Sequence, residues 1–339
     1  ELQLFAEMPL VITAARKPQY ITQAPSTINV ITEQEIESSG ATKLSELLER
    51  LPGIYTPTAH NALDMLWIRG VGRQYNDNAL LLIDGAPYRT LYVSNFPLNE
   101  QLPLEDIKRI EVIRGPGSAL YGSNAFTGVI NIITKHAEDI ENGEVSSELS
   151  SWDGQNHTLL IGKTAENFQV SLFARYLVGE GYKSGLDDEG LSSVESREPK
   201  NETLNIKFTQ GDFNFSAHLS RFEINDFTAV EGDDEGGVTE RDHLLVRAGF
   251  TRQLSAKMGW QLSAYYNQFK LDKLRIVSDE QADEDEEAFI SNTEIYGSIA
   301  GLELLTSRHI SPSQTFLVGI SFEAEELDHA FVDTRPTLN

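Results

Sequence analysis

The sequence predicts an α+β domain followed by antiparallel transmembrane β-barrel strands. The first part of the chain mixes helix and strand signals, whereas residues after about position 143 alternate apolar and polar side chains with a period of two. Short and long connections also alternate between the predicted strands, as they do in membrane β-barrels. We therefore expect a leader over residues 1–19, the α+β domain over 20–137 and the first part of a barrel over 138–339.

The composition narrows the class of protein. A net charge of −25 argues against a nucleic-acid partner, because a phosphate backbone requires a basic surface. The chain has no cysteine, which excludes a disulfide framework and fits passage through an oxidising periplasm. The longest apolar run, Ala79–Ile83, is far shorter than the roughly 20 residues of a membrane-spanning helix. Barrel strands need only every second residue to be apolar, so a membrane location stays open.

Two short helices are predicted near the start of the α+β domain. Thr32 and Glu35 have the spacing of a capping box, in which both side chains cap main-chain N–H groups. Gly40 is expected to end this helix, and Thr42 to cap the next one. That second helix is indicated by leucines spaced to form one buried face, namely Leu44, Leu47, Leu48 and Leu51.

The rest of this domain reads as short strands separated by glycines. Leu80–Ile83 is a buried strand that runs into the tight turn Asp84-Gly85. Residues 109–135, RIEVIRGPGSALYGSNAFTGVINIITK, join a strand, a Gly-Pro-Gly turn, one helical turn and a β-branched strand. Glycines placed where the backbone must turn or approach closely indicate a compact sheet.

About nine strands are predicted after Glu144. Those with the clearest alternation cover residues 168–178, 203–209, 213–224, 242–252, 258–270, 295–305 and 316–324. We expect their apolar side chains to face lipid, namely Phe168, Val170, Leu172, Trp260, Leu262, Val318 and Ile320. Polar neighbours should face the barrel lumen, namely Gln169, Ser171, Gln261, Ser263 and Ser321. Because barrels whose lumen holds a plug have about 22 strands, the predicted barrel is incomplete.

Taken in order, the motifs of the first part resemble the plug domain of TonB-dependent outer-membrane receptors. They are LVITAAR at 10–16, APSTINVITEQEI at 24–36, LSELLERLPGI at 44–54, WIRGVG at 67–72, LLLIDG at 80–85 and the 109–135 segment. The resemblance implies a plug inside a β-barrel in the outer membrane of a Gram-negative bacterium. It also implies uptake of a scarce ligand, driven by TonB and the inner-membrane motor complex.

The leader residues Leu10, Val11, Ile12, Thr13 and Ala14 form an extended, β-branched segment. Such a segment can add as a strand to the sheet edge of a partner, or it can be the first strand of the domain's own sheet. It lies where the family carries its TonB box, so the resemblance implies that these residues contact TonB. A segment with this role should be only weakly tied to the plug.

Arg69 and Arg114 each precede a glycine. Arginine forms bidentate pairs with carboxylates, although an exposed pair contributes only about 0–1 kcal/mol. The resemblance implies that both lock the plug onto glutamates of the barrel wall. The usual partners would lie on strands beyond Asn339.

Two predicted loops, residues 56–65 and 86–99, carry the candidate ligand contacts. Polar and aromatic groups on loops held by a rigid sheet are typical of binding sites, although ordinary surface loops carry them too. In the family these are the loops that face the ligand, and the candidates here are His60, Asn61, Asp64, Tyr88, Arg89, Tyr92 and Asn95.

Three long loops of the barrel region are acidic. Carboxylates can bind calcium with 6–8 oxygen ligands, and the weak candidates are Asp233, Asp234, Asp283 and Asp285. Runs of like charge are more often simply solvated, and none here keeps EF-hand spacing. No resident cofactor is expected, and calcium stays an open alternative.

The sequence favours a transporter over two other classes. The resemblance implies a ferric siderophore or similar metal chelate as ligand, with cobalamin or haem as the alternative within the family. An extracellular β-rich adhesin would lack the leader and would need no domain inside its strands. An enzyme is disfavoured, because G-x-S-x-G, H-E-x-x-H and phosphate-loop motifs are absent and no carboxylate pair is singled out.

Overall fold

The computed structural model describes most of the chain: residues 10–13, 16, 19–23, 27–58, 64–73, 75–91, 94–150, 153–179, 199–225, 237–255, 257–277, 289–311 and 314–336. Contacts divide the chain between Lys135 and His136 into two compact units. This division lies two residues before the end that we expected for the α+β domain. The leader does not stand apart, because its described residues belong to the first unit.

The first unit is built on one mixed sheet. Its elements are β1 (Leu10–Val11), β2 (Gln19–Tyr20), η2 (Ile21–Gln23), β3 (Ile28–Thr32), α1 (Glu33–Ser39), α2 (Leu44–Leu48), β4 (Ile54–Tyr55), β5 (Trp67–Ile68), β6 (Ala79–Ile83), β7 (Ala86–Pro87), β8 (Ile107–Arg114), α3 (Ser118–Tyr121) and β9 (Gly128–Thr134). The five-stranded sheet has the order β3-β8-β9-β6-β7, and two pairs, β1-β2 and β4-β5, lie outside it. Within this sheet, β6 and β9 pair in parallel.

The predicted N-cap residue is correct for the first helix and wrong for the second. The capping box is confirmed: the Thr32 hydroxyl accepts from Glu35 N–H, and the Glu35 carboxylate accepts from Thr32 N–H at 2.8 Å. Gly40 ends α1 in the left-handed conformation at φ 67°. The cap of α2 was predicted wrongly, because Lys43 rather than Thr42 is the N-cap residue. Thr42 instead donates its N–H to the Glu46 carboxylate at 2.8 Å.

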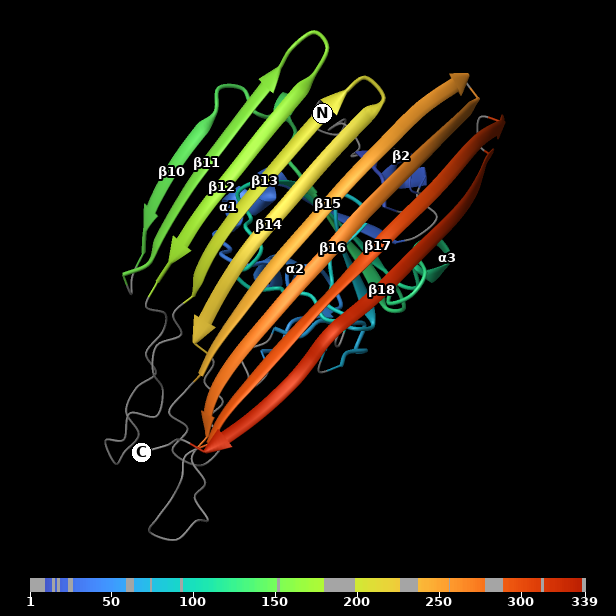
Figure 1. Cartoon of the computed structure of the whole chain (residues 1–339). Helices are drawn as coiled ribbons and strands as arrows, with labels where there is room; N and C mark the ends of the chain where they lie inside the picture. Colours follow the sequence, from blue (N-terminus) through green and yellow to red (C-terminus); the bar gives the residue numbers. More distant parts are fainter. Residues whose placement is uncertain are drawn as a thin grey trace. The chain divides into compact units, whose positions relative to one another are not determined.

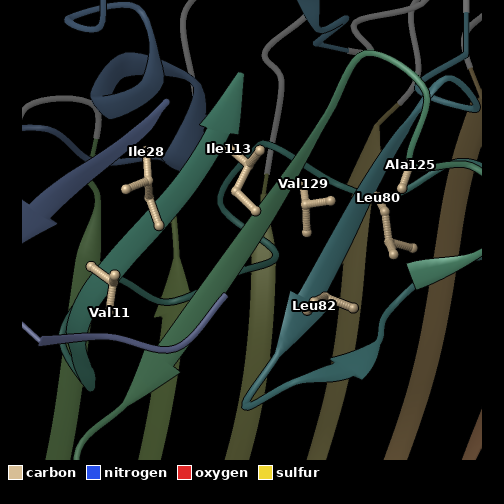
Figure 2. Close-up of a cluster of buried hydrophobic side chains, with 7 residues drawn as sticks. All are labelled: Val11, Ile28, Leu80, Leu82, Ile113, Ala125 and Val129. Atoms are coloured by element: carbon tan, nitrogen blue, oxygen red, sulfur yellow. The ribbon is translucent and has the colours of Figure 1, made fainter. Parts of the chain in front are cut away.

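The core of the first unit includes a leader residue. Figure 2 shows Val11 with side chains from β3, β6, β8 and β9, in a cluster that also contains Ala125. The other members are Ile28, Leu80, Leu82, Ile113 and Val129. Val11 is 0% exposed. Fully burying a valine contributes roughly 1.5–3 kcal/mol, so the leader is anchored by a hydrophobic contact as well as by hydrogen bonds.

The second unit is a single antiparallel sheet preceded by the short helix η3 (Ala137–Asp139). Its strands are β10 (Glu144–Leu149), β11 (Gln155–Thr164), β12 (Gln169–Val178), β13 (Lys200–Gln210), β14 (Phe213–Asn225), β15 (Gly237–Ser255), β16 (Met258–Val277), β17 (Phe289–Ser311) and β18 (Gln314–Pro336). These nine described strands follow one another in chain order across the sheet (Figure 1). The predicted strand number and all-antiparallel pairing are confirmed.

The two sides of this sheet differ in polarity, as the alternation predicts. On the apolar side, four of the seven predicted residues are exposed: Phe168, Leu262, Val318 and Ile320. The other three, Val170, Leu172 and Trp260, are half-buried. On the other side, Ser171 and Ser263 are buried, at 5% and 6% exposure, and Gln169 and Gln261 are half-buried. This side also buries some apolar side chains, among them Phe173 and Phe269. Ser321 is exposed instead of buried, because β18 is an edge strand with a neighbour on one side only. A sheet with exposed apolar and buried polar side chains is the reverse of a soluble protein's pattern and is typical of a membrane barrel.

The apolar side ends at a row of alternating charges. Glu202, Arg221, Asp242 and Lys270 lie opposite one another in sequence across β13 to β16. The Arg221 Nε lies 3.0 Å from Asp242 Oδ1. Opposite charges on facing strand positions contribute about 0.2–1 kcal/mol each. Two positions further along three of these strands, the same side carries Leu204, Leu219 and Leu244.

Candidate functional site

The leader lies against the first unit more firmly than the sequence suggested. Leu10 and Val11 pair with Tyr20 and Gln19. Val11 and Thr13 are both fully buried, whereas Ile12 is 36% exposed. The expectation of a weakly tied leader is therefore wrong for this conformation, because the apolar Val11 side chain completes a core cluster (Figure 2).

A single carboxylate holds the residues that follow β1. Oε2 of Glu111, on β8, accepts the N–H groups of Ile12 and Thr13, both at 2.8 Å, and the Thr13 hydroxyl at 2.7 Å. Oε1 of Glu111 accepts Arg109 Nε at 2.8 Å. Glu111 is 0% exposed, and a buried carboxylate is stable only with such a set of donors.

Every polar group of Thr13 is engaged. Its hydroxyl accepts from Asn131 Nδ2 at 3.0 Å while donating to Glu111, and its carbonyl accepts from the Tyr121 hydroxyl at 2.9 Å. The Arg16 guanidinium lies 4.8 Å from the centre of the Tyr121 ring. Asn131, Tyr121 and Glu111 thus form a leader cradle of three side chains from β9, α3 and β8.

Arg69 and Arg114 come together around two glycine turns. Arg114 Nη1 donates to the Pro52 carbonyl, and Arg69 N–H donates to the Gly53 carbonyl at 2.7 Å. A side chain at Gly115 would meet Arg69 Nη1 at 3.8 Å. Arg69 itself has a positive φ of 54°, which its turn requires. Within the described part of the chain, no carboxylate pairs with either guanidinium, so two adjacent cations lie at this turn.

Asp64 holds its loop in place instead of presenting a carboxylate. It is 6% exposed, and it accepts the hydroxyls of Ser45 at 3.0 Å and Thr58 at 2.8 Å. The Lys43 ammonium lies 3.4 Å from the same carboxylate. Its oxygens are already used inside the unit, so Asp64 joins Thr58 to Ser45 and Lys43, and its contact with a ligand stays a prediction.

The described candidates of the second loop have similar surroundings. Tyr88 is 0% exposed and its hydroxyl accepts from Gln101 Nε2 at 3.4 Å, while Arg89 is 5% exposed. Asn95 is half-buried, and its carbonyl accepts the Thr90 N–H at 2.8 Å, which closes the loop. Among these three residues, only Asn95 keeps substantial access to solvent.

Sequence reasoning missed Asn76, which joins the two loops. Its Oδ1 accepts Leu66 N–H at 2.7 Å, and its Nδ2 donates to the carbonyls of Asp64 and Phe96, both at 3.2 Å. Its own N–H donates to Asn95 Oδ1 at 3.3 Å. Asn76 is 1% exposed. A polar residue between loop-like neighbours carries no pattern that marks it as a buried hub.

Several predicted residues lie outside the described residues: Ala14, His60, Asn61, Tyr92, Asp233, Asp234, Asp283 and Asp285. Where side chains are described, no group of three or more His, Asp or Glu residues is arranged to hold a metal ion. No helix in the described ranges is both long and apolar enough to span a membrane.

Comparisons with known proteins agree with this architecture. Residues 21–129 match the family model of the TonB-dependent receptor plug domain. The chain is 36% identical over 155 residues to the vitamin B12 transporter BtuB of Vibrio cholerae, covering 45% of this chain and 25% of BtuB. It is 40% identical over 203 residues to the iron-regulated outer membrane virulence protein of the same species, covering 56% and 30%. The chain therefore spans under a third of these relatives' lengths.

Solved structures share the fold across both units. The ferric-catecholate import receptor Fiu of E. coli K12 superposes with a TM-score of 0.68 at 15% identity, covering 91% of this chain and 50% of Fiu. The pyoverdine-bound FpvA of P. aeruginosa superposes with a TM-score of 0.71 at 14% identity, covering 93% and 44%. The chain therefore contains a plug domain of the TonB-dependent receptor family at residues 21–129, followed by an antiparallel sheet whose fold is shared with these solved structures.

Proposed function

We propose that this chain is the plug and first barrel portion of an outer-membrane transporter that takes up a metal chelate, most simply a ferric siderophore. The observation that carries the proposal is the pairing of a plug domain with a sheet whose apolar side is exposed and whose polar side is buried. The row of alternating charges supports a membrane location, because it ends the apolar side where a lipid layer would give way to water. The protein would do no covalent chemistry.

The leader is proposed as the contact with TonB. Leu10 and Val11 already adopt β-structure, and the segment is short and N-terminal to the plug core. Strand addition would use its main-chain N–H and C=O groups, and the inner-membrane motor complex would act through this contact. The two adjacent cations, Arg69 and Arg114, are proposed to pair with barrel carboxylates, since two neighbouring guanidinium groups at one turn attract negative partners.

Ligand contacts are proposed for the two loops joined by Asn76. A ferric chelate is favoured by the iron-regulated relative, whereas cobalamin is the second candidate because another relative is named a vitamin B12 transporter. Calcium binding by Asp233, Asp234, Asp283 and Asp285 stays a weaker proposal.

Uptake by a strain carrying the full-length receptor tests the function. The wild type should take up a ferric catecholate chelate. Ile12→Pro, which removes a main-chain donor and fixes φ, should bind the chelate at the surface and fail to import it. Ile12→Ala keeps the N–H group and should import normally. Cobalamin import alone would favour the second ligand. Surface binding with no import by the wild type would favour an adhesin.

A further inference from the structure

We propose that Glu111 is the docking anchor of the leader, and that its carboxylate must release two main-chain N–H groups before the leader can add to a partner as a strand. The proposal rests on the proposed role of the leader as the TonB contact. It adds a positioning residue, on β8, that is remote from the leader in sequence.

The geometry at Ile12 and Thr13 carries the inference. In an extended strand, consecutive N–H groups point to opposite sides of the chain. Here both N–H groups point to one oxygen, Glu111 Oε2, at 2.8 Å each. The backbone therefore bends after Val11, which is where β1 ends. Consecutive N–H groups that converge in this way form a small anion-binding site, here for a carboxylate.

Docking on Glu111 and strand addition exclude each other for this reason. A partner strand needs an extended Ile12–Thr13 backbone with its N–H groups on opposite sides. The docked leader has neither the extended shape nor the free donors. A TonB contact through these residues thus requires the leader to leave the carboxylate first.

The burial of Glu111 makes this step costly. When the leader leaves, Oε2 loses three donors, whereas the Arg109 contact to Oε1 is retained. A buried charge that loses most of its donors is strongly disfavoured, so Glu111 shifts the equilibrium toward the docked leader. Val11 and Thr13 add to the same state through the core cluster and the cradle.

Cysteine accessibility tests the anchor without any ligand or partner. The chain has no cysteine, so Val11→Cys in the full-length receptor introduces a thiol at a position that is 0% exposed. A maleimide should label it only when the leader undocks. We expect Glu111→Gln to raise the labelling rate at least tenfold, because an amide offers one acceptor oxygen and a donor that repels the N–H groups.

A matched control separates this effect from general loosening of the sheet. Asp84 accepts the N–H of Thr134 at 3.1 Å and its hydroxyl at 2.8 Å, which parallels Glu111 and Thr13. Asp84→Asn should leave labelling of the introduced thiol unchanged. If Glu111→Gln distorts the fold, Thr13→Val removes only the hydroxyl and should raise labelling about threefold. The proposal that Glu111 anchors the leader would be overturned by equal labelling rates in all variants. It would also be overturned if Asp84→Asn raised the rate as much as Glu111→Gln does.

Binding of a purified TonB periplasmic domain distinguishes this proposal from the proposed function. With the anchor correct and the leader as TonB contact, Glu111→Gln should bind that domain more tightly than wild type in proportion to its labelling. Faster labelling with no binding of the domain by any variant would support the anchor and refute the coupling role. Tight binding by the wild type with unchanged labelling in Glu111→Gln would support the coupling role of the leader and refute Glu111 as its anchor.

Discussion

The Lys135 ammonium lies 2.9 Å from Oε1 of Glu33, so the last residue of the first unit is tied to the start of α1. The Lys108 ammonium lies 2.9 Å from the other oxygen of the same carboxylate. Burial raises the pKa of Glu33, but the hydrogen bonds and charges of the two lysines outweigh it and leave the pKa below the ordinary 4.5. Two cations thus clamp one carboxylate where β8 begins and β9 ends.

This clamp predicts a pH dependence of the first unit's stability. A carboxylate with a lowered folded-state pKa stabilises the fold above its unfolded pKa and loses that contribution as the pH falls through the folded value. Glu33→Gln should therefore cost about 1 kcal/mol at pH 7, discounted for partial exposure. The difference in unfolding free energy between this variant and wild type should disappear as the pH falls below 4.5. Denaturant unfolding followed by Trp67 fluorescence, with Trp152 and Trp260 replaced by phenylalanine, measures the unfolding free energy of both proteins at each pH. A gap that is the same at pH 3 and pH 7 would contradict the prediction.

The caps of α1 and α2 predict unequal effects from two threonines. Thr32→Ala removes the α1 capping box and should destabilise the first unit by about 1 kcal/mol. Thr42→Ala should change stability by less than about 0.3 kcal/mol, because its side chain caps nothing and its N–H group remains. Thermal unfolding of the two variants side by side is the measurement. Equal losses would mean that the capping geometry does not decide the stability.

Local signals made the elements predictable. The Thr32–Glu35 spacing and the leucines of α2 identified two helices, and alternation identified the antiparallel strands. Strand ends were predicted less well: β15 begins at Gly237, not at Asp242. Near this end the apolar side carries Glu240 and Asp242, so the apolar alternation stops while pairing with β14 continues.

Contacts between distant segments were beyond sequence reasoning. Glu111 looks like any charged residue in a strand, and its three donors come from a leader 98 or more residues away. The leader's own pattern fitted both an added strand and a docked one, because both need apolar β-branched residues. The sequence also shows the polarity of Asp64 and Tyr88, the predicted ligand contacts, but not their burial.

Asn76 is predicted to be a structural hub of the two candidate loops. Asn76→Ala removes three side-chain hydrogen bonds and leaves buried main-chain groups unpaired, so it should cost about 2–4 kcal/mol. Arg73→Ala is the control: its pair with Asp77 is largely exposed, and the change should stay within about 0.5 kcal/mol. Differential scanning calorimetry compares the two. Similar melting temperatures for both variants would refute the hub.

Two glycines that would both clash with an added methyl group are predicted to respond differently. At Gly128 a Cβ would lie 2.6 Å from the Ile113 carbonyl oxygen and 2.7 Å from Ile68 Cδ1. The carbonyl belongs to β8, which pairs with β9 on this side, so it cannot move without breaking the sheet. Gly128→Ala should therefore destabilise the first unit by about 2–3 kcal/mol.

At Gly72 a Cβ would lie 2.1 Å from the Trp67 ring. That ring is 37% exposed and can rotate away, although this would break its edge-to-face contact with Tyr55. Gly72→Ala should therefore cost less than about 1 kcal/mol but change the Trp67 emission, since the ring's surroundings change. Urea unfolding and fluorescence spectra of the two variants measure both effects. A larger stability loss at Gly72 than at Gly128 would show that the ring, and not the sheet, is the rigid neighbour.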